Sequence, residues 1–492
     1  MTSNATSQPL PTVSEPATPA NITGASPESP DLPEAPSNIP TGATPDPEPD
    51  PTASTPLNFF QVWYPLSPLE DLDPKRPTSI ILLGERFVVW KPGNGSQFRV
   101  FRDRCPHRCV PLSEGRVDEK TGHLMCCYHG WQFDETGACR RIPQLENEQI
   151  LQQQVDNFRV EVFPCQEALG LLWIWPDSTT PELAAQTPLA QASTTDASQG
   201  FVWSNMVREL DYDWSTLVEN IVDPAHVPVA HHGIQGDRAK ARPLAIEVLK
   251  SDRSGIQAHI QRGFNSQITY TAPCLVDYRF NIGADKVAGL VVYCIPVAPG
   301  KSRLVGLFPR NFAKGVGQLI PRWWEHLYRR HPVLDGDALM LNLQEQVLQQ
   351  KGGLKQWKQQ YKMPPQADRM VLEFRRWLDR YCSDPLPWGP VSTAGVDQTL
   401  DRRRLLDHYH SHTEICSSCR TALARFRQLQ KVLVAVALIL VAVAALLPDA
   451  QRLTLGLELV GVALLCGSVW AGITYRVIPK FYFEDYVHAD RP

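Results

Sequence analysis

The stretch Cys105–Trp131, CPHRCVPLSEGRVDEKTGHLMCCYHGW, decides how the rest of the chain is interpreted. It holds two short clusters, Cys105-x-His107 and Cys126-x-x-His129. Two thiolates and two imidazoles are typical of a [2Fe–2S] cluster in which two Cys bind one iron and two His bind the other. A structural zinc site is the alternative, because Cys₂His₂ sets also bind zinc. Zinc fingers usually pair Cys with Cys and His with His, whereas each half here supplies one of each, so the sequence favours the iron–sulfur cluster.

Composition sets broad limits on the class of protein. A chain of 492 residues is long enough for two or three domains, and its formal net charge of −4 gives no reason to expect nucleic-acid binding. Twelve cysteines are spread unevenly, which argues for a reducing compartment rather than a disulfide scaffold. Cys109 and Cys127, beside the predicted ligands, are interpreted as small buried packing residues. Residues 1–57 are rich in Pro, Ser and Thr and lack Lys and Arg, so we expect a disordered tail and not a secretory signal or transit peptide.

Two domains are predicted after the tail. Residues 58–180 contain short runs of β-branched and aromatic residues separated by turn residues, which predicts a small all-β domain carrying the cluster on two loops. Residues 176–198 are rich in Ala, Thr, Ser and Pro and are predicted to be a linker. Residues 199–400 are predicted to form a second domain. Strands between residues 257 and 295 would make one open sheet there, and residues 335–351 would make a helix.

The second domain contains two histidines, His226 and His231, close enough in sequence to share a metal ion. Asn220, Asp223 and His226 are three residues apart and would lie on one face of a helix. Two prolines interrupt this run, so we expect a broken or kinked helix. A bent segment can aim both imidazoles at one point.

Two His and one carboxylate form the facial triad of a non-haem Fe(II) oxygenase, which leaves coordination positions for O₂ and substrate. The carboxylate must come from another part of the chain. Asp337, near the start of the helix predicted at 335–351, is our choice, and Asp335 is the reserve. Two nearby His alone are more often solvated surface residues. An upstream cluster that can deliver electrons makes the combination a workable oxygenase.

Residues 401–430 contain Cys416-Ser-Ser-Cys419, which follows three histidines, His408, His410 and His412. Three interpretations are open at this stage. The two Cys could form a dithiol switch that exchanges with thioredoxin-like partners, or a zinc site that uses one of the His. The third interpretation is a solvated segment ahead of a membrane.

Residues 431–476 hold two apolar runs, 432–447 and 453–473. The first is shorter than the ~20 residues of a usual span, but two such runs joined by a short link favour a transmembrane hairpin. A short tail, 477–492, follows. Basic residues flank the outer ends of both runs, so the positive-inside rule places the catalytic domain on the cytoplasmic or stromal side. The membrane could be a thylakoid, plasma or envelope membrane.

These stretches together resemble the Rieske non-haem iron oxygenases, and most closely the pheophorbide a oxygenase group. That group includes the chloroplast translocon-associated Rieske protein and is related to chlorophyllide a oxygenase. The resemblance covers about residues 58–490. Its matching stretches are NFFQVWYPL, CPHRCVPLSEGR, CCYHGWQFD, ENIVDPAHVPVAHHG, the His-rich run into CSSC, and DYVHAD. It implies an α+β fold class: an all-β Rieske [2Fe–2S] domain, an α+β catalytic domain with an antiparallel sheet and mononuclear iron, and a C-terminal transmembrane helical hairpin.

The resemblance also implies roles for single residues. The implied cluster ligands are Cys105, His107, Cys126 and His129, and the implied iron ligands are His226, His231 and Asp337. Asp223 resembles the acid that links a cluster His on one subunit to an iron-bound His on its neighbour, which would require a homotrimer. The alternative for Asp223 is a helix-capping acid. Asn220 is a second catalytic candidate, and His232 is not expected to be a ligand.

The expected function is a membrane-anchored oxygenase that takes electrons from a ferredoxin-like donor and uses O₂ to oxidise a lipophilic ring compound. The resemblance implies a chlorophyll-derived tetrapyrrole such as pheophorbide a. It also favours Cys416 and Cys419 as a redox-regulatory dithiol with a thioredoxin as partner. Two alternatives stay open: an oxygenase of another lipophilic ring compound, and a non-catalytic Rieske electron-transfer protein of a membrane.

Overall fold

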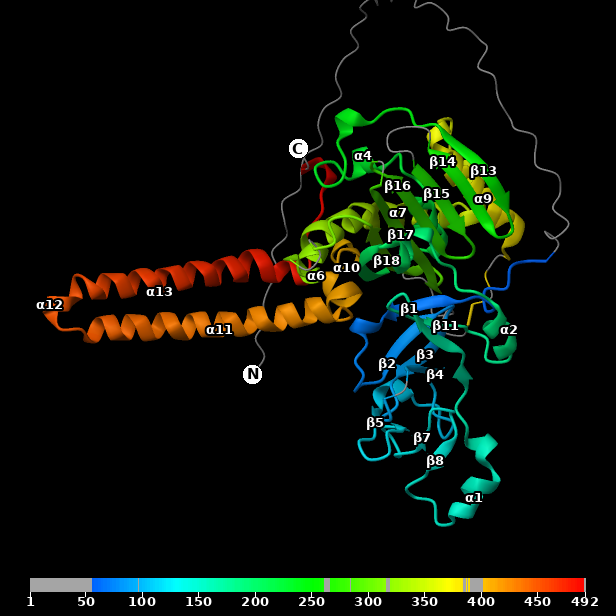
Figure 1. The fold of residues 1–492 in the computed structure, drawn as a ribbon, viewed down its shortest axis with the longest axis horizontal. Coiled ribbons are helices and arrows are strands. Elements are labelled where there is room, and N and C mark those ends of the chain that lie inside the picture. The colour runs from blue at the N-terminus through cyan, green and yellow to red at the C-terminus, as the bar shows by residue number, and fades with distance from the viewer. Residues whose placement is uncertain are drawn as a thin grey trace, which may run out of the picture. The chain divides into compact units, whose positions relative to one another are not determined.

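The computed structural model describes residues 55–95, 97–260, 266–283, 285–315, 319–383, 386, 388–389 and 401–490. The predicted disordered tail lies, apart from its last three residues, outside the described residues. All described elements belong to one compact unit, residues 50–492. Figure 1 shows the fold as a ribbon.

The N-terminal domain is built from three small antiparallel sheets, as the predicted all-β character requires. The first has the order β1-β11-β10, the second β2-β3-β4-β9, and the third β5-β6-β7-β8. Their strands are β1 Tyr64–Pro68, β2 Thr78–Leu82, β3 Glu85–Trp90, β4 Arg99–Arg102, β5 Arg116–Val117, β6 Leu124–Met125, β7 Gln132–Phe133, β8 Cys139–Arg141, β9 Val162–Phe163, β10 Cys165–Ala168 and β11 Leu171–Ile174. Two short helices accompany them, α1 Glu148–Gln153 and α2 Pro181–Gln186.

Strand β3 separates two hydrophobic cores. Successive side chains of a strand point to opposite faces, so its run of apolar residues serves both sides. Phe87 and Val89 pack in the large core shared with the second domain. Val88 and Trp90 pack in a smaller core that contains two of the predicted cluster ligands, Cys105 and Cys126.

The hairpin between β2 and β3 joins the two domains. Leu83 and Gly84 both have positive φ, 53° and 73°, as the tightest hairpin turns require. Their backbone N–H groups donate to Pro296 O and Val297 O at 2.9 and 2.7 Å. The turn therefore docks onto a strand of the second domain and fixes the N-terminal domain against it.

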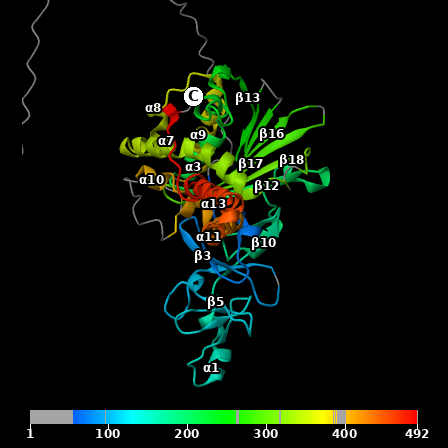
Figure 2. The ribbon, with the colours of Figure 1, turned by 90° about the vertical axis from the view of Figure 1, so that its left-hand side faces the viewer.

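The second domain contains a seven-stranded antiparallel sheet in the order β12-β18-β17-β16-β15-β14-β13, with helices packed on it. Its strands are β12 Val202–Leu210, β13 Ile246–Asp252, β14 Gly255–Ile260, β15 Ser266–Thr271, β16 Leu275–Asn281, β17 Val287–Ala298 and β18 Lys301–Arg310. Its helices include α3 Trp214–Ile221, α4 Val227–Ala230, α7 His331–Gln350, α8 Trp357–Gln360 and α9 Arg369–Tyr381. Figure 2 shows α3, α7 and α9 together on one side of the sheet. The predicted α+β class is confirmed.

Helix α7 begins earlier than the sequence suggested and continues an unbroken helical run. α6 Arg322–Glu325 leads into the π-helical turn η8 His326–Arg330, which leads into α7. The wide turn ends at Arg330, two residues before Pro332, which has no N–H to bond to the turn before it. One continuous element therefore carries His326 near its start and Asp337 further along.

The C-terminal region forms a long helical hairpin. A π-helical turn, η12 Tyr409–Thr413, precedes α11 Ser417–Leu446, which is followed by α12 Asp449–Arg452 and α13 Leu455–Gly472. Both long helices are apolar, largely exposed and long enough to cross a membrane. Figure 1 shows α11 and α13 side by side. The apolar run 432–447 is short for a membrane span when counted alone. The basic segment before it belongs to the same helix, so α11 as a whole is long enough.

Candidate metal sites

Two loops of the N-terminal domain bring the four predicted cluster ligands together. One loop follows β4 and the other joins β6 to β7, and each closes on itself through a backbone bond, from Cys105 N to Val110 O at 2.8 Å and from Cys126 N to Trp131 O at 2.9 Å. Both Cys side chains are buried. The rings of His107 and His129 lie nearer the surface, with centroids 4.5 Å apart.

The two loops share one turn geometry. The residue four positions after each Cys donates its N–H back to that Cys carbonyl, from Cys109 at 2.9 Å and from Gly130 at 3.2 Å. Both residues have positive φ, 61° and 70°. Cys109 and Cys127 are exposed, so their interpretation as buried packing residues is wrong. Cys109 occupies the left-handed position that glycine fills in the other loop.

The donor set fits a Rieske cluster on its chemistry. Two inner thiols and two outer imidazoles match a cluster whose Cys-bound iron lies inside and whose His-bound iron faces outward. Trp131 stacks on the His107 ring at 4.6 Å with an interplanar angle of 7°, which fixes the orientation of that imidazole. Electrons can therefore enter and leave at the His edge.

The second domain gathers His226, His231 and Asp337 into one group. The two Nε2 atoms of the His are 3.2 Å apart, and His231 Nε2 lies 3.4 Å from an Asp337 oxygen. The other Asp337 oxygen is 4.0 Å from His226 Nε2. One ligand atom from each residue lies within 4.8 Å of the others. Two imidazole nitrogens that face each other beside a buried carboxylate are the arrangement a bound cation satisfies.

The predicted break in the helix is what aims the two imidazoles. α3 ends at Ile221, and α4 begins only at Val227, directly after His226. His231 follows the last residue of α4 and is almost fully buried. Burial alone would lower the pKa of His226, but the nearby carboxylates of Asp223 and Asp337 outweigh it and raise the pKa.

Asp223 contacts the iron-ligand candidate His226 and also closes the local turn. One carboxylate oxygen lies 3.5 Å from His226 Nδ1, and the other accepts from Ala225 N at 2.7 Å. This bond closes the turn between α3 and α4 but caps neither helix, since the N-cap of α4 is His226 and the N-cap of α3 is Asp213. The second oxygen is left beside the imidazole. A carboxylate on the outer nitrogen of a ligand His is a frequent outer-shell contact.

Asp335 faces away from this group. Its two oxygens bind Arg208 Nη2 at 2.7 Å and His408 Nε2 at 2.9 Å, and all three side chains are buried. Burial opposes ionisation of Asp335, yet Arg208 and His408 lower its pKa below the usual value. The structure thus places Asp337, and not the reserve choice Asp335, beside the two His.

The other two predictions near the triad have different outcomes. Asn220 lies buried at the end of α3, where its carbonyl accepts from Asp223 N at 3.2 Å. A catalytic role for its side chain stays a prediction. His232 Nδ1 accepts from Arg238 N at 3.0 Å, outside the triad, as expected for a residue that is not a ligand.

Two tyrosines next to the triad were not assigned from the sequence. Tyr212 is buried, its hydroxyl has no partner among the described residues, and burial together with the charge of Asp337 raises its pKa. Tyr486 donates to Ala230 O at 3.1 Å and packs where a side chain at Gly336 would have to be. Tyr486 lies within DYVHAD, so the stretch was noted but the residue's place at the site was not.

The CSSC motif lies in a third group that the sequence defined only in part. Cys416 and Cys419 are buried together with His412 and with His326 of η8. His408 binds Asp335 instead, and His410 is exposed and bonded to Asp407. His326 was missed because it lies far away in the sequence and carries no spacing signal.

Comparisons with known proteins agree with this geometry. The family described as "Rieske [2Fe-2S] domain" matches residues 62–164, and the family described as "Pheophorbide a oxygenase" matches residues 270–355. The chain is 37% identical over 453 residues to the chloroplastic pheophorbide a oxygenase of Oryza sativa subsp. japonica, which covers 87% of this chain and 84% of that protein. It is 33% identical over 462 residues to flavonoid 8-hydroxylase 2 of Ocimum basilicum, covering 88% and 86%.

A solved structure supports the fold. NdmA of Pseudomonas putida CBB5 superimposes with a TM-score of 0.51 at 22% identity and covers 65% of this chain and 89% of that one. The cofactors are a Rieske [2Fe–2S] cluster and a mononuclear iron, which the two donor sets fit. The chain therefore belongs to the pheophorbide a oxygenase family of Rieske-type iron oxygenases.

Proposed function

We propose that the chain oxygenates a chlorophyll-derived tetrapyrrole with electrons from a ferredoxin-like donor. The observation that carries the proposal is the group of His226, His231 and Asp337 in a chain that also holds a complete cluster site. The tetrapyrrole is supported by the similarity to a pheophorbide a oxygenase. Two electrons, two protons and O₂ would place one oxygen atom in the substrate and release the other as water.

The chain's own residues would position and tune the iron. When bound, the iron supplies open coordination positions for O₂ and substrate. His226, His231 and Asp337 would hold it from one side, and the single carboxylate would leave a net positive charge for O₂ chemistry. Asp223 orients the His226 ring through its outer nitrogen. Tyr212, buried and protonated beside Asp337, offers a hydroxyl proton close to the site.

Electron delivery is proposed to cross a subunit boundary in a homotrimer. His107 is exposed, so the cluster edge of one chain is accessible to another molecule. The Asp223 side chain is 25% exposed while it contacts His226. A cluster His of a neighbouring subunit could therefore bond to the outer side of the same carboxylate, which would become the link between cluster and iron.

We propose that the hairpin α11–α13 anchors the chain in a membrane. Both helices present long apolar surfaces, and basic residues flank their outer ends. We place the catalytic domain on the stromal or cytoplasmic side of the membrane. The names of the two relatives call them chloroplastic, which supports the stromal side. Such an anchor brings the site to a substrate that dissolves in lipid.

A second substrate class has a specific observation behind it. The relative from Ocimum basilicum is a flavonoid hydroxylase at an identity close to that of the pheophorbide a oxygenase. The same metal sites can therefore serve a different lipophilic ring. The non-catalytic alternative is an electron carrier, and electron transfer by the cluster alone would not require the triad of His226, His231 and Asp337.

The test is product analysis with the full chain in lipid nanodiscs. The protein would be mixed without oxygen with pheophorbide a, chlorophyllide a or a flavone, and then given ferredoxin, ferredoxin reductase, NADPH and isotopically labelled O₂. His226→Ala is the inactive control, and His232→Ala is its match, because His232 is adjacent to the triad but outside it.

We expect the label in an oxidised tetrapyrrole, made by the unaltered chain and His232→Ala but not by His226→Ala. Label in the flavone alone would show that the substrate is a flavonoid and not a tetrapyrrole. Reduction of the cluster with no labelled product from any compound would contradict the oxygenase and favour the electron carrier.

A further inference from the structure

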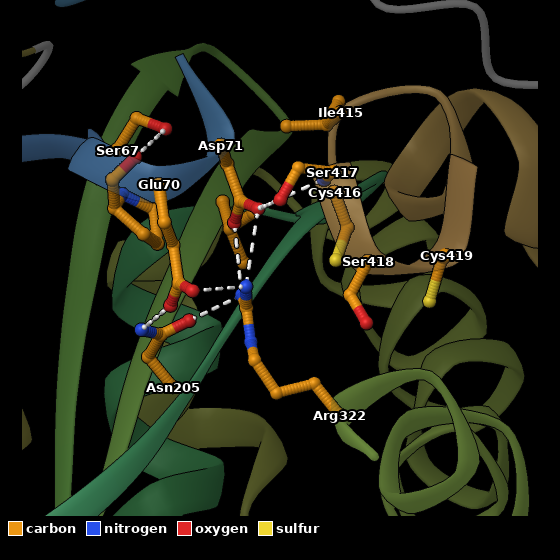
Figure 3. A network of polar contacts seen from close by, with 12 residues as sticks. Ser67, Glu70, Asp71, Asn205, Arg322, Ile415, Cys416, Ser417, Ser418 and Cys419 are labelled. Carbon is orange, nitrogen blue, oxygen red and sulfur yellow. Dashed lines mark hydrogen bonds and ion pairs between the residues drawn. The ribbon is translucent and has the colours of Figure 1, made fainter. Parts of the chain in front are cut away.

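A second group of metal-binding side chains lies outside both iron sites. His326 of η8, His412 of η12, Cys416 directly before α11 and Cys419 in its first turn converge on one point. All four side chains are almost completely buried. In Figure 3 the sulfur atoms of Cys416 and Cys419 both point towards the helical run that carries Arg322.

Four of the six distances between the donors lie close to the edges of a zinc tetrahedron, and all four donors lie within 4.8 Å of one another. Zinc–sulfur bonds of about 2.3 Å and zinc–nitrogen bonds of about 2.0–2.1 Å give N–S edges of roughly 3.5–3.6 Å and an N–N edge of roughly 3.3 Å. The nitrogen atoms of His412 and His326 are 3.0 Å apart. His326 Nδ1 lies 3.7 Å from Cys416 Sγ and 3.5 Å from Cys419 Sγ, and His412 Nε2 lies 3.3 Å from Cys419 Sγ.

Backbone carbonyls fix which nitrogen of each imidazole faces the centre. His412 Nδ1 lies 2.5 Å from Val207 O, and His326 Nε2 lies 2.9 Å from Asn205 O, both on β12. A carbonyl only accepts, so these two ring nitrogens carry the protons. The inner nitrogens then turn lone pairs towards each other and towards both sulfurs. A cation at the centre removes this repulsion, and carbonyl-bonded outer nitrogens are typical of metal-bound His.

We propose that His326, His412, Cys416 and Cys419 bind a structural zinc ion that fastens the membrane hairpin to the catalytic domain. Two sulfurs and two nitrogens in a closed tetrahedron suit zinc, and a site with four protein ligands leaves no position for substrate. The ion would be separate from the cluster and the mononuclear iron.

The position of the site explains what the ion would hold. Four elements meet there. They are the run α6–η8–α7 that also carries Asp337, the turn η12, the start of α11, and the sheet-edge strand β12. The local hydrophobic core is small, with Leu327, Leu423 and Phe481 as its largest buried members. A small core of this kind gains most from a metal cross-link.

A polar network beside the site reinforces the same junction. Asp71 of the N-terminal domain accepts from Ser417 N at 2.8 Å, at the N-terminus of α11, and binds Arg322 of α6 at 3.1 Å. Arg322 also binds Glu70 at 2.9 Å and donates to Asn205 at 2.6 Å (Figure 3). Because Asn205 supplies the carbonyl that orients His326, the network and the proposed zinc site are directly joined.

The dithiol interpretation of Cys416 and Cys419 predicts a different chemistry. Exchange with a thioredoxin needs a thiolate that an external sulfur can reach. Both Cys have no exposed surface, and both sulfurs face the two imidazoles instead of solvent. The dithiol switch stays a prediction, and the following experiment decides between the two.

The experiment counts zinc and examines its ligands in the full-length protein purified in detergent without added metal or chelator. We expect about one zinc per chain, and X-ray absorption should show two sulfur neighbours at about 2.3 Å and two nitrogen neighbours at about 2.0–2.1 Å. Cys419→Ser and His412→Ala should lower zinc at least about tenfold. One matched control is Cys382→Ser, which changes a partly buried Cys of the large core, and the other is His410→Ala, which changes the exposed His of the same segment. Both variants should bind as much zinc as the unaltered chain.

Alkylation of the unaltered protein keeps the proposal testable if the variants do not fold. Cys416 and Cys419 should resist alkylation until a chelator and a denaturant are both added, and zinc should be released in the same step. Zinc below about a tenth per chain would overturn the proposal, whether peptide mass analysis finds a Cys416–Cys419 disulfide or two free thiols. A fourth iron in place of zinc would overturn it as well.

Discussion

The triad of His226, His231 and Asp337 and the group built around Cys416 and Cys419 differ in the way that catalytic and structural metal sites differ. The triad has three donors, one of them a carboxylate, and His226 remains partly accessible. The other group has four donors, two of them sulfur, all buried. An open set leaves room for reactants, whereas a closed set only cross-links.

One helical run, α6–η8–α7, supplies a residue to each group, His326 to one and Asp337 to the other, and a buried network lies between them. His331 stacks on His408 with centroids 4.2 Å apart and meets His412 at 4.7 Å, and His408 binds Asp335. Burial and the neighbouring His408 lower the pKa of His331, so this ring is neutral. The helix between the two groups is thus held by the stacked rings of His331 and His408 and by the ion pair of Asp335 with Arg208.

The largest effect is expected from Asp337→Ala. Removing a ligand should remove the mononuclear iron and lower turnover by more than about 100-fold, because even outer-shell changes cost 10–100-fold. Iron quantification and product analysis give the result, and the cluster spectrum should be unchanged. Retained iron in this variant, with iron lost in Asp335→Ala, would reverse the assignment of the third ligand.

Asp335→Ala asks whether the network between the sites is structural. It leaves the buried Arg208 without its carboxylate, so we expect a loss of about 3–5 kcal/mol of stability. The thermal unfolding midpoint of the solubilised chain would fall, while folded protein at low temperature should keep the mononuclear iron. The midpoint of Asp335→Asn should fall less than that of Asp335→Ala, since asparagine keeps the shape of the side chain and part of its hydrogen bonding. A midpoint equal to that of the unaltered chain would show that the ion pair is not needed.

Asp223→Asn tests whether Asp223 links the cluster to the iron or only closes the turn at Ala225. The amide keeps the size of the side chain and an acceptor for Ala225 N but loses the charge beside His226. We expect iron to stay bound and substrate-dependent oxidation of the reduced cluster to slow by about 10–100-fold. Stopped-flow absorption of the cluster measures it. An unchanged rate with a small loss of stability would leave Asp223 with its turn-closing role alone.

The smallest effect concerns Glu345, which lies on α7 and contacts neither metal group. Burial and the charge of Asp213 raise its pKa to about 8. The folded chain therefore holds a proton that the unfolded chain releases near pH 4.5, so this residue makes the fold progressively less stable as pH rises from about 4.5 to about 8. Glu345→Gln can still accept from Asp213 N.

Glu345→Gln should be more stable than the unaltered chain at about pH 9, by on the order of 1–3 kcal/mol, and should differ little at about pH 4. Unfolding midpoints across this range test it, and iron and zinc contents should match those of the unaltered chain. A stability gain that is equal at both ends of the range would rule out the titration as its cause.

The predictable features of the molecule are those whose signals are local. Each cluster loop contains its own Cys and His. The prolines after Ile221 predict the break in the helix that directs His226 and His231 to one point. The sequence favoured Asp337 over Asp335 but kept both, because residues two apart on a helix face nearly opposite directions and only packing shows which of the two sides meets the His. His326 had no local signal at all, since its partners lie more than eighty residues later.

The most direct measurement is a parallel count of iron and zinc in the unaltered chain, in Asp337→Ala and in Cys419→Ser. We predict about three irons and one zinc per unaltered chain. Asp337→Ala should lose one iron and keep zinc, and Cys419→Ser should lose zinc and keep the irons. Absence of zinc from the unaltered protein would contradict the account. Loss of both metals together in each variant would also contradict it, because the account has two separate sites, an open iron site and a closed zinc site.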